Sequence, residues 1–205
     1  MQVKIQFLNL KLSLLNKLNQ YLCLILALPL IMPVAAMAET YLTPEQFVQT
    51  AFGATKLKTA PTVESLWLTK DVATQVENIL GHSSKQARLK FWKADLQTAW
   101  ILDEIGKEEP ITAGFLVENG KILQVSILAY RESRGGEVRH ANFLKQYQGA
   151  SLQRDAQLNK TIDGISGATL SVRAMGRMAR LALYYDQISR TESTKPEPAK
   201  IQQTM

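Results

Sequence analysis

Hydrophobic and polar residues follow different patterns in successive parts of the chain, and the first part, residues 1–38, is distinct. It contains three lysines and no acidic residue, and an apolar run over 21–38 closes in Ala36-Met37-Ala38. This order of features is typical of a secretory signal peptide. We expect cleavage before Glu39, with an uncleaved anchor in the inner membrane as the alternative. In either case we expect the folded part in the periplasm.

Two short helices are predicted in the next segment, residues 39–84. Thr43-Pro44-Glu45-Gln46 combines an N-cap residue, a proline at the first helical position and a capping-box glutamine, which predicts a helix up to about Phe52. Apolar residues recur at helical spacing over 71–80, and Gly81 follows as a stop signal. We interpret 39–84 as a helical lead-in to the main domain.

From Arg88 onward the apolar period becomes that of β-strands. Strands are predicted over 88–94, 98–105, 111–117 and 121–130, and Asn119-Gly120 is the strongest hairpin signal in the chain. With a two-residue turn, one face of this hairpin carries Leu116, Leu123, Val125 and Ile127, and the other carries Ile111, Phe115, Val117 and Leu128. Because both faces are apolar, the sheet needs a covering layer on each side.

Two further helices and a polar tail complete the predicted elements. After Gly135-Gly136 we expect a helix over about 138–147, and later a long helix over about 168–188. The segment 191–205 has too few apolar residues to pack and is expected to be a disordered tail. The pattern predicts an α+β domain over 85–190, with an antiparallel sheet of four to five strands, a long C-terminal helix and short N-terminal helices.

Composition and charge exclude several classes of protein. The 205 residues are 46% hydrophobic and 20% charged, with 11 Gly and 7 Pro, which excludes disordered, collagen-like and extended coiled-coil chains. Three of the 24 basic residues lie in 1–38, so the remainder has 21 basic and 18 acidic residues. The basic balance is therefore partly a property of the signal, and no nucleic-acid partner is expected.

Cysteine and histidine are too few for most metal or redox centres. The only cysteine, Cys23, lies inside the expected signal peptide, so the mature chain has no disulfide, iron–sulfur cluster or C-x-x-C-H haem attachment. The two histidines, His82 and His140, argue against a histidine-rich metal site. We assign no metal site and no catalytic residue.

Candidate chemistry is concentrated where a loop meets the long helix, at Asp163-Gly164-Ile165-Ser166-Gly167-Ala168-Thr169. Glycines let backbone N–H groups approach a ligand, and a helix N-terminus offers unpaired donors that suit a phosphate. A Walker A loop is excluded because no lysine follows Gly167. On spacing alone, the same residues also fit an ordinary cap, with Ser166 or Asp163 bonding to helix N–H groups.

The stretch from Asp163 to Thr169 resembles the D-x-x-S/T-G-A-T motif of the FMN-binding domain family. This family is typified by the flavinylated subunits of sodium-translocating NADH:quinone reductase and of the Rnf complex. Its motif threonine carries FMN through a phosphoester, so the resemblance implies covalent FMN on Thr169. It also implies a separate flavin transferase that uses FAD and Mg²⁺ and recognises Asp163 and the residues Ser166, Gly167 and Ala168.

A second stretch, Tyr130 to Val138 followed by Phe143 to Gly149, is similar to that family's E-T-P-G loop and the aromatic-glycine sequence after it. This similarity implies that Glu132, Ser133 and Arg134 contact the flavin. Ser133 and Arg134 stand where threonine and proline are usual. Together the two stretches extend the resemblance over roughly residues 85–188, so we interpret 85–190 as an FMN-binding domain.

The resemblance implies a periplasmic, membrane-associated electron-transfer flavoprotein that exchanges electrons with membrane or periplasmic redox partners. In such a protein the flavin supplies the redox chemistry, and the chain sets its potential and access. Two alternatives stay open: a flavin-dependent reductase of a small acceptor, and a flavin-free structural or sensory module in which Thr169 only caps a helix. Arg173, Arg177 and Arg180 by default form a solvated helix face, although they could dock an acidic partner.

Overall fold

The computed structural model describes residues 39–84 and 86–193. The predicted signal peptide and the chain after residue 193 lie outside the described residues. Where the chain is described, no helix is both long enough and apolar enough to cross a membrane.

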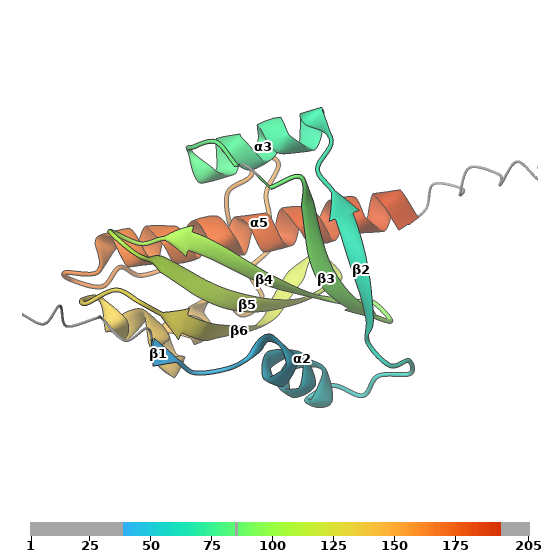
Figure 1. Ribbon diagram of the computed structural model, residues 1–205, viewed down its shortest axis with the longest axis horizontal. Coiled ribbons are helices and arrows are strands. Elements are labelled where there is room, and N and C mark those ends of the chain that lie inside the picture. The colour runs from blue at the N-terminus through green and yellow to red at the C-terminus, as the bar shows by residue number, and fades with distance from the viewer. Residues whose placement is uncertain (1–38, 85, 194–205) are drawn as a thin grey trace, which may run out of the picture. The chain divides into compact units, whose positions relative to one another are not determined.

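An antiparallel sheet of six strands, in the order β1-β6-β5-β4-β3-β2, forms the centre of the described structure (Figure 1). Five of the strands have at least six residues, so the predicted α+β class and the sheet of four to five strands are confirmed, and the two-residue β1 adds an edge. The strands are β1 (Glu39–Thr40), β2 (Thr62–Trp67), β3 (Arg88–Ala94), β4 (Gln97–Ile105), β5 (Pro110–Glu118) and β6 (Lys121–Tyr130).

Helices cover both faces of the sheet, as its two apolar faces require (Figure 1). α5 (Thr169–Ser193) packs along one face and α2 (Pro44–Gly53) lies on the other, while α3 (Lys70–Leu80) packs against α5. On the α5 side, the fully buried Trp100 stacks on Phe91 with ring centroids 4.4 Å apart. Trp100 therefore belongs to the core on this side of the sheet.

The predicted starts and turns of several elements are confirmed in detail. Thr43 caps α2 in a capping box with Gln46, and Gly81 ends α3 in the left-handed conformation with φ +78°. In the β5–β6 turn, Asn119 and Gly120 both have positive φ, 50° and 72°, as a type I′ hairpin turn requires.

A buried carboxylate fixes α5 on the sheet. Asp186 is fully buried and accepts hydrogen bonds from the Thr98 hydroxyl of β4 at 2.7 Å and from the Gly120 N–H of the hairpin turn at 3.2 Å. Arg190, one helical turn later, donates to both carboxylate oxygens at 2.9 and 3.0 Å. Because a buried charge requires such partners, these bonds hold the helix in a defined position along the strands and so fix where its N-terminus lies.

The predicted division of the β5–β6 hairpin into two faces is partly wrong. Val125 and Ile127 pack on the α5 face with Phe115, and Leu128 packs on the α2 face, the reverse of the expectation. The pairing of β5 with β6 shifts register twice, which leaves Leu123 and Leu128 as extra residues in β6. Each extra residue reverses the alternation of the side chains that follow it.

Three further expectations need correction. The helix predicted over 138–147 is divided, because His140 is extended at ψ 136°; the pieces are η1 (Gly136–Arg139), α4 (Ala141–Leu144) and η2 (Lys145–Tyr147). The segment 39–84 is more than a helical lead-in, because β2 pairs with β3 over its whole length. Residues 191–193, assigned to the tail, continue α5.

Candidate functional site

One end of the sheet brings together the segments that carry the two motifs, at the left of Figure 1. The β4–β5 turn, the end of β6, the loop over 131–135 and the first turn of α5 meet there, and residues of all of them line two adjoining pockets. Residues more than 60 positions apart in the sequence, such as Lys107 and Ser171, thus line the same pocket.

The first turn of α5 has backbone N–H groups without a partner in the part of the chain that the structure describes. Ala168 is the N-cap residue, because its carbonyl accepts the N–H of Val172 at 2.9 Å, and its own N–H donates to the Ile165 carbonyl at 3.0 Å. Among the described residues, no side chain accepts a hydrogen bond from the N–H groups of 169–171. The alternative of an ordinary cap formed by Ser166 or Asp163 is therefore not what the structure adopts.

The Thr169 side chain is exposed beside these donors. The backbone conformation of Gly167, the residue before the N-cap, accounts for this exposure. Gly167 has φ +81°, a left-handed conformation that side-chain-bearing residues rarely adopt, and a Cβ on it would meet no atom within 4 Å. The glycine is thus required by its backbone angle and not by crowding. The turn directs the chain so that Ala168 is buried while Thr169 and Leu170 face solvent.

Thr169 lines a pocket of about 560 Å³ between α5, the loop and the β4–β5 turn. Charged side chains of both signs lie on its wall: Lys107 and Arg134 are basic, and Glu108 and Glu132 are acidic. The remaining lining residues are Ser133, Gly167, Ala168, Leu170 and Ser171. Within the described structure, an exposed hydroxyl, uncapped helix N–H groups and two cations line this pocket. N–H groups at a helix start and basic side chains are the groups that bind a phosphate.

Hydrogen bonds from Tyr130 tie the loop to the helix. Its hydroxyl donates to the Arg134 carbonyl at 2.5 Å and lies 3.2 Å from the Ser171 Oγ. Burial raises the pKa of Tyr130, so the hydroxyl stays a neutral donor. Gly135 passes close to the same atoms, and a Cβ there would lie 3.0 Å from the Ser171 Oγ.

Glu132 holds the loop against the β4–β5 turn. Its Oε1 accepts the backbone N–H groups of Lys107, Glu108 at 2.8 Å and Glu109 at 3.1 Å. Burial alone would raise the pKa of this carboxyl, but the three N–H donors outweigh it and the net pKa is lowered. Glu132, predicted to contact the flavin, is therefore engaged chiefly in positioning the two loops that form the pocket.

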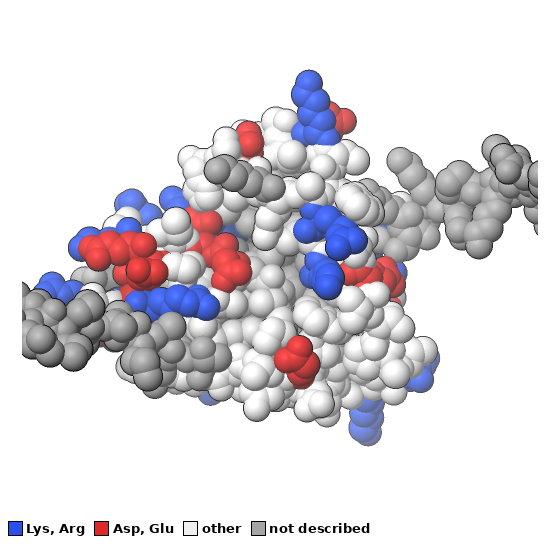
Figure 2. All heavy atoms as spheres, viewed as in Figure 1, with Lys and Arg blue, Asp and Glu red and all other residues white. Residues whose placement is uncertain are grey.

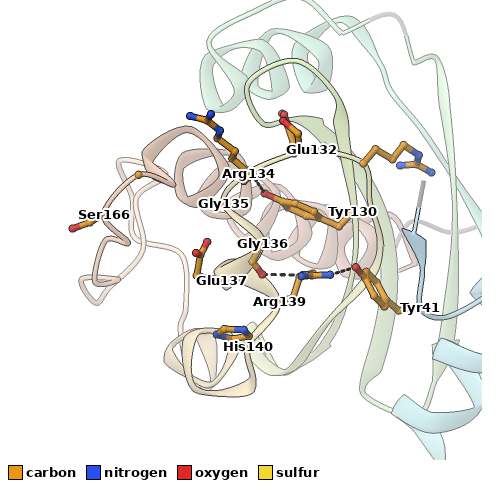
Figure 3. Close-up of a pocket in the computed structure, with 13 residues that line it drawn as sticks. Tyr41, Tyr130, Glu132, Arg134, Gly135, Gly136, Glu137, Arg139, His140 and Ser166 are labelled. Carbon is orange, nitrogen blue, oxygen red and sulfur yellow. Dashed lines mark hydrogen bonds between the residues drawn. The ribbon is translucent and has the colours of Figure 1, made fainter. Parts of the chain in front are cut away.

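A second pocket, of about 690 Å³, lies on the other side of residues 132–134 (Figure 3). Arg139 stands in its wall with its guanidinium 5.2 Å from the ring centre of Tyr41 and 5.5 Å from that of Tyr130. It also donates to the Gly136 carbonyl at 2.9 Å and to the Tyr41 hydroxyl. This wall thus presents two aromatic rings with a cation packed against both of them.

Acidic side chains gather on the face shown in Figure 2 at the same end of the sheet, with basic side chains beside them. Glu108 and Glu109 of the β4–β5 turn are exposed, and Lys107 forms an ion pair with Glu108 at 2.9 Å. The field at the pocket is therefore mixed in sign, and no single charge dominates it.

The structure brings most of the predicted site residues together. Glu132, Ser133, Arg134, Gly167, Ala168 and Thr169 all line the Thr169 pocket, and Ser166 lines the second pocket. Asp163 lines neither: it is exposed, and its N–H donates to the Gln146 side chain at 2.7 Å. The sequence did not indicate Lys107, Tyr41 or Arg139 as site residues, because all three lie outside the stretches that resemble the family motifs.

These residues fit an FMN phosphate, because the hydroxyl of Thr169, the N–H groups of 169–171, which have no cap within the described structure, and two cations line one pocket. The described residues contain no group of three or more His, Cys, Asp or Glu that could hold a metal ion.

Comparison with known proteins agrees with this assignment. Residues 106–184, from the β4–β5 turn into the second half of α5, match the model of the FMN-binding domain family. No curated protein matches the chain. The matched segment contains the loop over 131–135, both pockets apart from Tyr41, and Thr169. The part of the chain that forms most of the site thus matches the FMN-binding domain family, and this match supports flavin binding.

Proposed function

We propose that this protein is a periplasmic electron-transfer flavoprotein that carries FMN in phosphoester linkage to the hydroxyl of Thr169. One observation supports the linkage above all others: the exposed hydroxyl lies on a helical turn whose N–H groups have no cap among the described residues. Lys107 and Arg134 line the same pocket, together with the carboxylates of Glu108 and Glu132. The family match supports FMN as the group, whereas the linkage, the electron transfer and the location are the proposal.

Attachment requires a separate flavin transferase and FAD. The Thr169 oxygen attacks the phosphorus on the flavin side of the FAD pyrophosphate, and a P–O bond forms there. The pyrophosphate linkage breaks, AMP leaves, and the hydroxyl proton passes to water. The product carries FMN less one water, and no oxidation or reduction takes place. This chain contributes the acceptor hydroxyl and the recognised sequence around it.

Non-covalent contacts at this site would retain a flavin poorly, which favours a covalent link. The helix N-terminus contributes roughly 0.3–1 kcal/mol per exposed negative charge. Micromolar affinity requires about 8 kcal/mol. In a compartment from which a released cofactor can diffuse away, a covalent bond removes this dependence on affinity.

Residues around the loop have separate roles in this proposal. The N–H groups of 169–171 would hold the phosphate, and the pockets on either side of 132–134 offer space for the flavin ring. The bound flavin supplies the redox chemistry. Arg134 places a positive charge at the rim of both pockets, and Tyr130 keeps the loop backbone in place.

The test is the mass and fluorescence of the purified protein after co-expression with a flavin transferase. The wild type should gain the mass of FMN less one water and stay fluorescent after denaturation on a gel. Thr169→Val, which keeps the shape but removes the oxygen, should abolish both signals while circular dichroism and melting temperature persist. Ser166→Ala removes another hydroxyl three residues earlier and should remain labelled. Covalent fluorescence in Thr169→Val, or none in the wild type, would refute the linkage.

The 690 Å³ pocket favours one second candidate, a flavin-dependent reductase of a small acceptor. A reductase predicts that the rate of flavin reoxidation saturates with acceptor concentration and that pocket variants such as His140→Ala change the saturation constant. An electron carrier predicts no such saturation with small acceptors.

A further inference from the structure

A groove of about 430 Å³ runs along the outer side of α5, and its wall is basic. The side chains that give it this character are Lys160, Arg173, Arg177 and Arg180, which we call the basic groove. The other residues of its wall are neutral: Gln157, Leu158, Ile162 and Gly176. Four cations therefore converge on one depression whose described lining contains no acid.

Only one of the four cations has a carboxylate partner among the described residues. Arg177 pairs with Glu104 at 2.8 Å, and Glu104, which is 5% exposed, also bonds to His82 at 3.1 Å. Lys160 donates to a backbone carbonyl, that of Gln148, at 3.1 Å. The Arg173 side chain is exposed and makes no hydrogen bond or ion pair within the described structure.

Arg180 is the most unusual of them. It is half-buried, yet it donates only to neutral oxygens, the closest being the Ile79 carbonyl at 3.0 Å. Burial lowers the pKa of its guanidinium, and the neighbouring Arg177 lowers it further. Charges that are removed from water are normally paired. The Arg180 guanidinium instead lies near another cation, Arg177. An anion that entered the groove would supply the missing opposite charge.

The groove lies on the same side of α5 as Thr169. Arg173, Arg177 and Arg180 follow Thr169 by four, eight and eleven residues, which at 3.6 residues per turn places all of them on one stripe. At a rise of about 1.5 Å per residue, the stripe of cations extends from about 6 to about 16 Å along the axis from Thr169. The cations are thus spread over about 10 Å, which suits several acidic side chains on a surface better than one small anion.

We propose that the basic groove docks an acidic surface of a redox-partner protein and so brings the partner's redox centre beside the flavin on Thr169. This proposal rests on the proposed function, because docking next to Thr169 serves electron transfer only if the flavin is attached there. Complementary charge steers association and selects the orientation of encounter. The partner is expected to present a cluster of Asp or Glu near its own redox centre.

The first test uses the purified chain without flavin and is therefore independent of the linkage. A fluorescein-labelled ten-residue glutamate peptide should bind, and Arg173→Glu combined with Lys160→Glu should weaken binding by about tenfold or more at low salt. The control carries the same change of charge elsewhere: Lys90→Glu with Lys56→Glu. Lys56 is exposed and follows α2, the helix on the sheet face opposite α5. Lys90 is exposed on β3, on the sheet face opposite α5, because its neighbours Leu89 and Phe91 point into the α5-side core. The control should change the affinity by no more than about twofold.

The second test uses the flavin-loaded protein and two oxidants of opposite charge. Reoxidation by hexacyanoferrate(III), a trianion, should slow by about threefold or more in Arg173→Glu at low salt, and reoxidation by hexaammineruthenium(III), a trication, should speed up. Equal changes for both oxidants, or equal peptide binding by the groove and control variants, would overturn the docking proposal. So would displacement of the peptide by inorganic phosphate at constant ionic strength, which would indicate a small-anion site. Loss of covalent labelling alone, with the peptide result intact, would count against the linkage and not against the basic groove.

Discussion

Replacing Tyr130 and Tyr147 with phenylalanine should have different effects on the free energy of unfolding. The hydroxyl of Tyr130 donates to the Arg134 carbonyl and contacts the Ser171 Oγ, and Tyr130 is 5% exposed. The hydroxyl of Tyr147 is fully buried and has no hydrogen-bond partner among the described residues. Replacing each tyrosine with phenylalanine removes one oxygen and leaves the ring, so the difference between the two variants reports on hydrogen bonding.

The expected magnitudes follow from what each substitution leaves behind. Tyr130→Phe removes a hydrogen bond worth about 0.5–1.5 kcal/mol and leaves the buried Ser171 Oγ without its partner, for a loss of about 1–2 kcal/mol in the free energy of unfolding. Tyr147→Phe removes a buried hydroxyl whose desolvation is uncompensated, so the free energy of unfolding should stay constant or rise by up to about 1 kcal/mol. For a domain of this size, 1 kcal/mol corresponds to roughly 2–4 °C in melting temperature.

Urea unfolding followed by circular dichroism measures the free energy of unfolding of both variants. The fluorescence of attached flavin reports changes in the loop between the two pockets. Because Tyr130 fixes the loop between the two pockets, Tyr130→Phe should also change the fluorescence anisotropy of attached flavin, whereas Tyr147→Phe should not. Equal destabilisation by the two substitutions would refute the reasoning, since it would mean that ring packing and not the hydrogen bonds of Tyr130 determines the effect.

Further substitutions test the turns and charges around the site. Gly135→Ala should destabilise more than Gly167→Ala in thermal melts, because both glycines have positive φ but only at Gly135 would a Cβ also meet atoms at 3.0–3.1 Å. The hydrogen bond to Glu104 raises the pKa of His82 above 6.5, so the stability that His82 contributes is present below pH 6.5 and lost as pH rises through the higher folded-state pKa; urea titrations should show the gap between wild type and His82→Gln closing over that range. Arg134→Ala should lower the flavin midpoint potential, because a cation near the ring favours the anionic reduced form, and potentiometry that finds no change would place Arg134 outside the flavin environment.

The parts of the fold that the sequence predicted are those with strong local signals. The capping box at Thr43 and the left-handed glycine Gly81 marked helix ends, and Asn119-Gly120 marked the hairpin. β2 has only Leu66 buried among six residues, so its apolar alternation is too weak to reveal a strand, and only its pairing with β3 shows it. The bulges at Leu123 and Leu128 arise from register between strands, which no local pattern encodes.

At the site, the motif indicated residues that line the Thr169 pocket, but not the residues that hold them in position. Thr169 and Gly167 lie where the family motif implied, at the start of a long helix. Glu132 has a conformational role that the motif did not reveal, because its partners are backbone N–H groups of a turn some 25 residues earlier. Tyr41 reaches the second pocket from before α2, a contact between segments nearly 100 residues apart that the sequence cannot indicate.

Several departures from ordinary local rules occur together at the N-terminal end of α5. A helix N-terminus normally has a capping side chain, yet the N–H groups of 169–171 have none within the described structure, although Ser166 and Asp163 are close in sequence. Leu170 is 43% exposed in the same turn, and Gly167 just before it is left-handed. Further along the helix the buried Asp186 is fully engaged, because it accepts hydrogen bonds from Thr98 of β4, from the Gly120 N–H of the β5–β6 turn and from Arg190. The donors, the apolar side chain and the hydroxyl that stand together at the first turn of α5 therefore favour the proposal that the ligand binds there.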